Sequence, residues 1–220
     1  MTEGRSGRIG AGDDAGERSQ AMIAVAGVTA LLAVAAVLAS LGWLHARPTG
    51  LSPVRSAVSQ YGITDYRAGY RVATIAFGVA GLALAAGLHR AVTGRDARLV
   101  VLLLVVFAFA RGAISWFPMD RPGAERTSTG RAHGLLAIAA FGAVTVCAFR
   151  LAAALDQAGR WPGLAPVSVA LGFAMAACLA GMLLAGSQPA ARAWFGAIER
   201  GFYLSAIAWF AVFAAACAVT

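Results

Sequence analysis

Residues 99–120 read LVVLLLVVFAFARGAISWFPMD. From Leu99 to Phe117 this stretch is apolar or small, with Arg111 as its single charged residue. Its length suits a helix that crosses the hydrocarbon core of a bilayer, which takes about 20 residues. Every backbone amide in hydrocarbon needs an internal partner, and a helix supplies one. The stretch therefore predicts a membrane-spanning helix with one charge near its polar end.

Five further apolar runs of similar length predict the same structure. They cover residues 21–44, 68–88, 134–155, 163–185 and 201–219. None shows the alternation of about ten residues that is typical of transmembrane β-strands. We therefore expect an all-α, polytopic membrane protein: a six-helix transmembrane bundle over residues 21–220, spanning at about 21–44, 68–88, 99–117, 134–155, 163–185 and 201–219.

The overall composition agrees with a membrane protein. Of the 220 residues, 60% are hydrophobic and 13% are charged, against about a quarter charged in an ordinary soluble domain. Mean hydropathy is +0.73. These values exclude a soluble globular protein, an intrinsically disordered chain and a small secreted domain stapled by disulfides.

The N-terminal residues 1–20 are rich in Gly, Ser and Asp with mixed charge, and predict a flexible polar tail. The apolar run that follows is longer than the 7 to 15 residues of a signal-peptide core, so we interpret it as a retained first span. Cleavage after the AVLA sequence at 36–39 remains an alternative.

The connections between spans differ in length, and this places three polar loops together. The loops after the second and fourth spans are short, whereas those after the first, third and fifth are longer and more polar. With six spans, the three longer loops share one membrane face. The arginines give no positive-inside bias, because eight fall on one face and nine on the other. We expect a cytoplasmic-membrane location with both termini cytoplasmic, since the polar tail carries no secretory signal.

The net charge of +8 comes with 18 basic residues, all of them arginine. They are scattered over the loops, so we predict attraction to anionic lipid headgroups and no binding of nucleic acid. The three histidines lack the spacing of a metal site. We predict no metal and no cofactor.

Besides the six spans, the sequence predicts a short helix in the first long loop, where residues 51–62 read LSPVRSAVSQYG. Ser52 is a good N-cap, Pro53 suits the first helical position and Gly62 suits the residue after the helix. The segment predicts a short interfacial helix that carries Arg55 and Ser59. It either closes the bundle as a surface helix or contributes ligand contacts.

Arg111 is the most informative residue of the sequence. A charge inside a span costs about 2.5 to 3.5 kcal/mol on insertion scales, and such residues usually face the bundle interior or a wet cavity. Ser115 follows one turn later, and Trp116 precedes a proline that favours a helix end. Asp120 can then fold back toward Arg111. Snorkelling of Arg111 to the headgroups is the alternative.

Other polar residues on the same face complete a candidate site. Asp65 precedes the second span, His133 opens the fourth, and Glu199, Arg200 and Tyr203 open the sixth. We predict ligand contacts from the set Arg55, Ser59, Asp65, Arg111, Ser115, Trp116, Arg200 and Tyr203. Asp120, His133 and Glu199 are the candidates for proton transfer.

These residues also resemble landmarks of a known family. Residues 52–55 (SPVR), 59–62 (SQYG), 116–120 (WFPMD), His133 and 199–201 (ERG) resemble, in order and placement, the bacterial membrane family called domain of unknown function 998. The resemblance covers residues 21–219. It implies a six-helix integral membrane protein with no assigned activity, and signature positions at Arg55, Ser59, Asp120, His133 and Arg200.

Three functions follow as expectations. The first is a basic, aromatic-rimmed pocket at one membrane face that binds a membrane lipid, a hydrophobic small molecule or another anionic amphiphile. The second is an integral membrane enzyme that acts on an isoprenoid or lipid by carboxylate and histidine proton transfer. The third is a small transporter or channel subunit, although no inverted repeat is visible.

Overall fold

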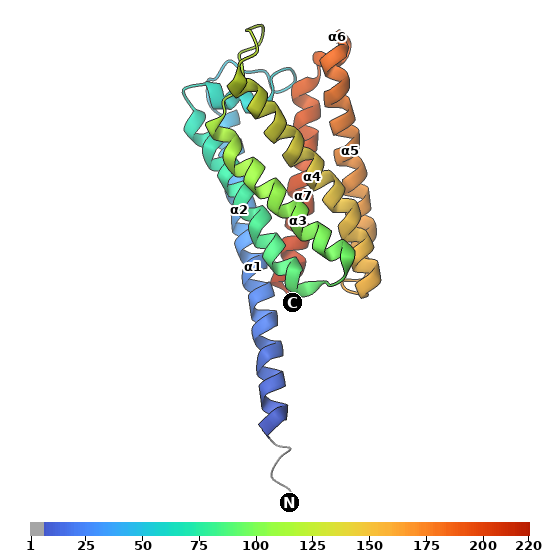
Figure 1. The fold of residues 1–220 in the computed structure, drawn as a ribbon. Helices are drawn as coiled ribbons and strands as arrows, with labels where there is room; N and C mark the ends of the chain where they lie inside the picture. Colours follow the sequence, from blue (N-terminus) through green and yellow to red (C-terminus); the bar gives the residue numbers. More distant parts are fainter. Residues whose placement is uncertain (1–6) are drawn as a thin grey trace, which may run out of the picture.

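The computed structural model describes residues 7–220, with side chains from residue 14 onward. It contains six long helices, each of which overlaps one predicted span: α1 (Gly7–His45), α2 (Arg67–Ala91), α3 (Arg95–Ala113), α4 (Ser128–Ala158), α5 (Leu164–Ser187) and α7 (Phe195–Ala218) (Figure 1). All six are long and apolar enough to cross a membrane. The prediction of an all-α, six-span bundle is confirmed.

Three short helices lie between the long ones. They are η1 (Val58–Ile63) in the first loop, η2 (Ile114–Trp116) after α3, and α6 (Pro189–Arg192) before α7. All three lie at the end of the bundle that carries the longer connections, residues 46–66, 117–127 and 188–194 (Figure 1). We call this the loop end, and the opposite end, where α7 finishes, the terminal end.

The long helices pack as a closed ring in the order α1, α2, α3, α4, α5, α7, and α7 returns to α1. An aromatic cluster fills the middle of the ring. The ring centroids of Phe77, Phe107 and Phe210 lie 5.1 Å from one another, and Trp209 is fully buried beside them. This packing leaves the loop end as the part of the interior where polar groups gather.

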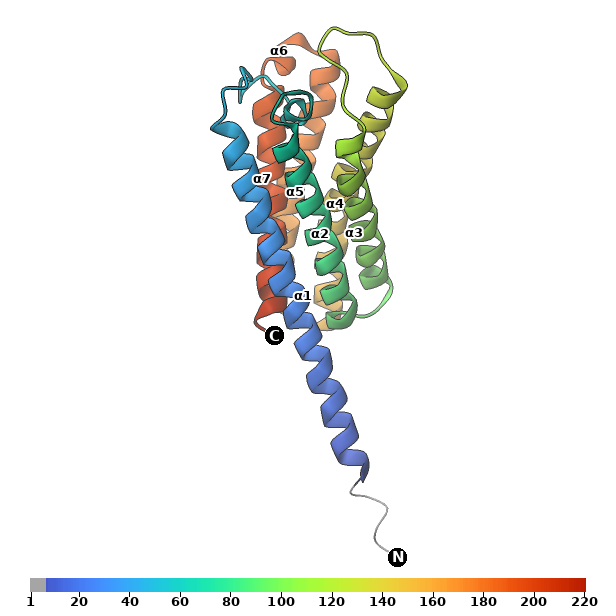
Figure 2. The same cartoon turned by 90° about the vertical axis from the view of Figure 1, so that its left-hand side faces the viewer.

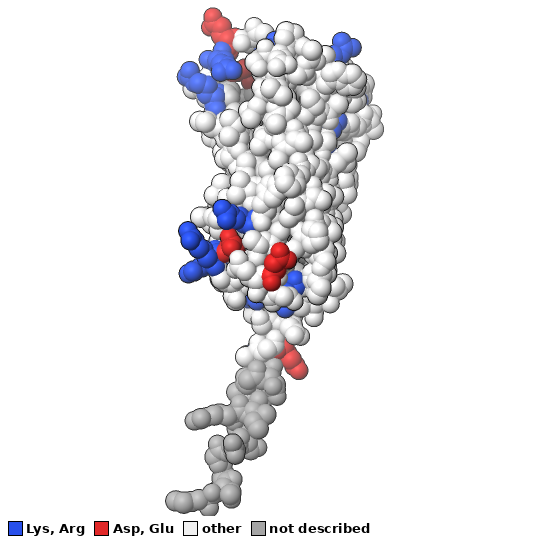
Figure 3. All heavy atoms as spheres, turned by 90° about the vertical axis from the view of Figure 1, so that its right-hand side faces the viewer, with Lys and Arg blue, Asp and Glu red and all other residues white. Residues whose placement is uncertain are grey.

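Charged side chains on the surface gather near the loop end and the terminal end of the bundle. On the face shown in Figure 3, arginine and acidic atoms lie near the two ends, with a broad uncharged band between them. A band of this kind is what a hydrocarbon core requires of the surface that it contacts.

Helix α1 starts earlier than the sequence predicted. It begins at Gly7 and extends past the terminal end of the bundle (Figure 2), although residues 1–20 had been predicted as a flexible tail. Extending an existing helix adds one hydrogen bond per residue without a new nucleation cost, so a stable span can continue into its polar flank. Residues 1–6 of that predicted tail lie outside the described residues.

The first loop also differs from its prediction. Ser52 Oγ accepts a hydrogen bond from Arg55 N at 3.4 Å, as an N-cap does. The chain then becomes extended at Ala57 (ψ 147°), and only the short η1 follows. Val58 and Tyr61 turn into the core while Val54 stays 40% exposed. The interfacial element is therefore a turn followed by a 3-10 helix, seated on the bundle.

Candidate functional site

Arg111 points into the bundle and lines a partly open cavity at the loop end. Its side chain is 2% exposed, which rules out snorkelling to headgroups. The cavity measures about 160 Å³, enough for about five water molecules at their liquid volume. Its polar lining comes from η1, α2, α3, α4 and α7, and consists of Ser59, Tyr70, Arg111, His133, Glu199 and Tyr203.

The guanidinium of Arg111 lies among aromatic rings and has incomplete hydrogen bonding. Its central carbon is 5.3 Å from the Tyr203 ring centroid and 5.9 Å from that of Phe77. Its Nε is buried and has no hydrogen-bond partner among the described residues. Within residues 14–220, the one ion pair with an N–O distance below 4.0 Å joins Arg150 and Asp96 on the surface, away from Arg111. The buried cation therefore has no carboxylate in direct contact.

Glu199 is the carboxylate that shares this cavity. Helix α7 begins at Phe195, so Glu199 lies a full turn inside it and is 4% exposed. Its Oε2 accepts a hydrogen bond of 2.6 Å from the backbone N–H of Val58 in η1. Glu199 thus both lines the cavity and holds the first loop over it.

Arg200 points to the other side of α7 and fastens the same loop. Its Nη1 donates to the carbonyl oxygens of Pro53 and Ser56, at 2.8 Å each, and its Nε donates to His45 Nε2 at 2.8 Å. Gly196 allows the loop backbone to come this close to α7, since a Cβ there would lie 2.5 Å from the Ser56 carbonyl oxygen. Arg200, predicted as a ligand contact, does not line the cavity.

His133 reaches the cavity from α4 with a defined tautomer. Its Nδ1 lies 2.8 Å from the Phe117 carbonyl oxygen. Because a carbonyl only accepts, Nδ1 carries the hydrogen and donates it. In the neutral ring Nε2 is then left as an acceptor, on a side chain that is 7% exposed and lines the cavity.

Asp120 lies outside the cavity, although the sequence suggested that it folds back toward Arg111. Its Oδ1 accepts from Thr127 Oγ1 at 2.6 Å, and its Oδ2 accepts from Thr127 N at 3.2 Å. The carboxylate thereby supports the start of α4, where backbone N–H groups have no helical partner. It packs against Gly130, where any side chain would overlap it.

The remaining predicted residues are dispersed around the loop end. Arg55 and Asp65 are exposed. Trp116 is 55% exposed, with the Arg71 guanidinium carbon 5.1 Å from its ring centroid. The Ser115 hydroxyl is buried, has no partner among residues 14–220 and does not line the cavity. These four predictions of ligand contact are not supported by a shared cavity.

Tyr70 is the polar cavity residue that the sequence prediction missed. A signal was present, because Tyr70, Thr74 and Phe77 follow one another at intervals of four and three residues and so share a helix face. All three are buried, and the Tyr70 hydroxyl has no hydrogen-bond partner within the described residues.

The cavity therefore combines a buried cation, a carboxylate, an imidazole and two phenols in a small volume. Such a set can bind a polar group through several hydrogen bonds, or exchange a proton with it. Within residues 14–220, His, Cys, Asp and Glu side chains nowhere gather in threes as a metal centre would need.

Comparisons with known proteins agree with the resemblance seen in the motifs. A family model described as "Protein of unknown function (DUF998)" matches residues 30–216. No curated protein and no solved structure matches the chain. The match spans most of the chain and includes all or part of each of the six apolar helices. The chain thus belongs to the DUF998 family, as a membrane protein with six candidate spans.

Proposed function

We propose that this protein binds an anionic amphiphile, a lipid or a lipid-like small molecule, with its polar group in the cavity around Arg111. One observation carries the proposal. A fully buried guanidinium with an unpartnered Nε lines a cavity, and no carboxylate lies within 4.0 Å of it among the described residues. Buried charges in proteins are normally paired.

Two unpartnered donors in the cavity favour a ligand that brings acceptor oxygens. Arg111 Nε–H and the Tyr70 hydroxyl have no partner in the described chain. Glu199 accepts from Val58 N through Oε2, and its Oε1 can still accept from a ligand oxygen that carries a hydrogen, such as that of a singly protonated phosphate. A carboxylate or phosphate oxygen in the cavity supplies acceptors to both unpartnered donors, and charge-assisted bonds to guanidinium are among the stronger ones in proteins.

The volume of the cavity restricts the polar group. A space of about 160 Å³ suits a carboxylate or a phosphate and is too small for a whole phospholipid. The apolar part of the ligand then lies outside the cavity, in contact with the bilayer. We infer accordingly that the ligand is an amphiphile and not a free metabolite.

Thermal unfolding of the purified protein in a non-ionic detergent tests this proposal. Hexadecyl phosphate and hexadecyl phosphocholine share a chain and differ in the charge and the size of the head. A ligand at 100 times its Kd stabilises a protein by about 2.7 kcal/mol. We expect hexadecyl phosphate to raise Tm by several degrees and the zwitterionic compound to leave it almost unchanged.

Two variants and a control connect that shift to the cavity. Arg111→Gln should abolish the shift and Tyr70→Phe should reduce it, whereas Arg98→Gln near the terminal end should behave like wild type. Tyr70→Phe keeps the ring and so remains informative if Arg111→Gln fails to fold. Equal Tm shifts with both compounds, in wild type and in Tyr70→Phe, would overturn the proposal.

An enzyme acting on an isoprenoid or lipid is the second candidate. It is favoured by His133 and Glu199, two of the three predicted catalytic residues, which line the same cavity. Asp120 contributes nothing there. Incubation with membrane lipids, followed by mass spectrometry, should give a product that His133→Gln fails to form. The transporter alternative gains no support, since Phe77, Phe107 and Phe210 fill the interior below the cavity.

We also propose the orientation expected from the sequence. The N- and C-termini are then cytoplasmic, and the loop end of the bundle lies on the outer side of the membrane. The terminal end carries the two short connections as well as the chain's C-terminus (Figure 1). Single cysteines at Thr93 and Glu125, in a chain without its own cysteines, distinguish the two orientations. A membrane-impermeant maleimide applied to intact cells should label position 125 and spare position 93.

A further inference from the structure

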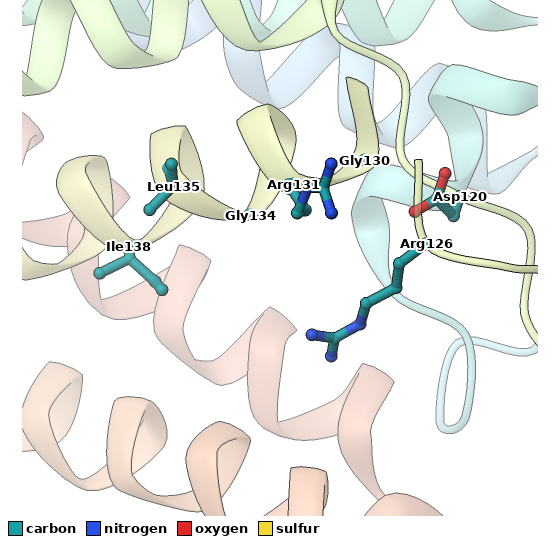
Figure 4. A pocket seen from close by; sticks show the side chains of 7 residues that line it. All are labelled: Asp120, Arg126, Gly130, Arg131, Gly134, Leu135 and Ile138. Carbon is teal, nitrogen blue, oxygen red and sulfur yellow. The ribbon is translucent and has the colours of Figure 1, made fainter. Parts of the chain in front are cut away.

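A second hollow lies beside the first, on the neighbouring face of α4. It is a surface groove of about 430 Å³. Figure 4 shows its lining: Asp120 and Arg126 from the second long loop, and Gly130, Arg131, Gly134, Leu135 and Ile138 from α4. The Arg126 side chain reaches into the open space from the loop side. No residue of this groove belongs to the cavity described above.

The two hollows lie on adjacent faces of α4. Successive helix positions are about 100° apart, so Gly134 falls between Ala137, which lines the cavity, and Ile138, which lines the groove. A Cβ built on Gly134 would meet no heavy atom within 4 Å. The helix surface is therefore open at the point where a ligand would pass from one hollow to the other.

The polarity of the groove follows that of an anionic amphiphile. Arg126 and Arg131 are exposed at its loop end, and neither has a carboxylate within 4.0 Å in the described chain. The one acid nearby, Asp120, is engaged with Thr127. Farther along α4, Leu135 is 69% and Ile138 is 62% exposed. Basic side chains thus lie where headgroups gather, and apolar ones where acyl chains do.

We propose that the apolar chain of the ligand lies in this groove and crosses α4 over Gly134, with its anionic head in the Arg111 cavity. The inference rests on the proposed function and adds the ligand class and the route. The ligand is a long-chain amphiphile with a small carboxylate or phosphate head. It enters sideways from the bilayer along α4, without passing through the loops.

Substitutions at the crossing point test the inference. Gly134→Leu places a side chain across the open helix surface, and Ile138→Trp fills the groove from an exposed position that tolerates a larger residue. Gly142→Leu is the matched control, since a Cβ there also meets nothing within 4 Å but it lines neither hollow. The probes are hexadecyl phosphate, with a long chain, and ethyl phosphate, which carries the same head and almost no chain.

Calorimetric titration should separate the two probes. We expect Gly134→Leu and Ile138→Trp to weaken hexadecyl phosphate binding at least about tenfold and to leave ethyl phosphate binding unchanged, with Gly142→Leu like wild type. If both groove variants bind hexadecyl phosphate as wild type does, the route along α4 is wrong while head binding stands. If wild type binds neither probe, the proposed function fails first and the inference fails with it.

Discussion

The Glu199 carboxylate of the last long helix accepts a 2.6 Å hydrogen bond from the backbone N–H of Val58, although 141 positions separate the two residues. The bond is buried and joins η1 to α7 directly above the cavity. The neighbouring Arg200 holds the preceding turn through its carbonyl oxygens. Two adjacent charged residues thus fix the first long loop as the roof of the candidate site.

Removing the Glu199 acceptor should loosen that roof. Glu199→Leu leaves the buried Val58 N–H without a partner, which costs about 1–3 kcal/mol. Glu199→Gln keeps an acceptor oxygen at nearly the same place and should be clearly more stable. Thermal unfolding in detergent compares the two variants. Equal loss of stability in both would show that the negative charge, and not the hydrogen bond, holds the loop.

Gly196 should tolerate no side chain. A Cβ there would lie 2.5 Å from the Ser56 carbonyl oxygen and 2.8 Å from that of Pro53, both of which are backbone atoms. Gly196→Ala must therefore displace the turn that Arg200 binds, and we expect a lower Tm. Gly142→Ala is the control, because nothing lies near its Cβ and alanine favours a helix by about 0.5–1 kcal/mol over glycine. A Gly196→Ala protein as stable as wild type would contradict the close approach.

Water should reach the cavity but not the neighbouring core. In a chain whose three cysteines (Cys147, Cys178 and Cys217) are replaced by alanine, Ser59→Cys should react with a small charged thiol reagent. Ala140→Cys, on a fully buried α4 residue outside the cavity lining, should not react. Hexadecyl phosphate should slow the reaction at position 59. Equal rates at the two positions would indicate that the hollow is not hydrated.

A buried hydrogen-bond chain in the bundle should contribute measurably to stability. The Trp209 Nε1–H donates to Ser168 Oγ at 2.8 Å, and this hydroxyl donates to the Ala148 carbonyl oxygen at 2.7 Å. Ser168→Ala leaves the indole N–H unpaired, at a cost of about 1–3 kcal/mol. Ser205→Ala removes only a hydroxyl bonded to its own helix and should cost much less. Similar Tm values for the two variants would contradict this assignment.

The six spans were predictable because the bilayer imposes one strong rule on sequence. Each span had to be an apolar helix of about 20 residues, and each predicted run overlaps one observed helix. The ends were less predictable, because local contacts decide them. Helix α4 starts at Ser128, six residues before its apolar run, since the Thr127 hydroxyl accepts a hydrogen bond from Gly130 N and Asp120 binds Thr127.

The site was predictable only where burial of a charge signals it. Arg111 faces the interior as expected, because a guanidinium among lipid tails is costly. Glu199 and His133 share its cavity. The roles of Asp120 and Arg200 depend instead on single backbone atoms, a helix N-terminus and two loop carbonyls. No residue pattern in one sequence encodes such distant partners, so these two residues could be placed at the loop end while their contacts could not be predicted.

The burial of Arg111 also has a consequence for biogenesis. The ribosome delivers α3 to the membrane well before α7, so the guanidinium enters the bilayer while Glu199 and Tyr203 have yet to be synthesised. Until the last helix arrives, that charge lacks its final surroundings. Only when α7 has packed into the ring does the guanidinium reach the cavity that the finished bundle gives it.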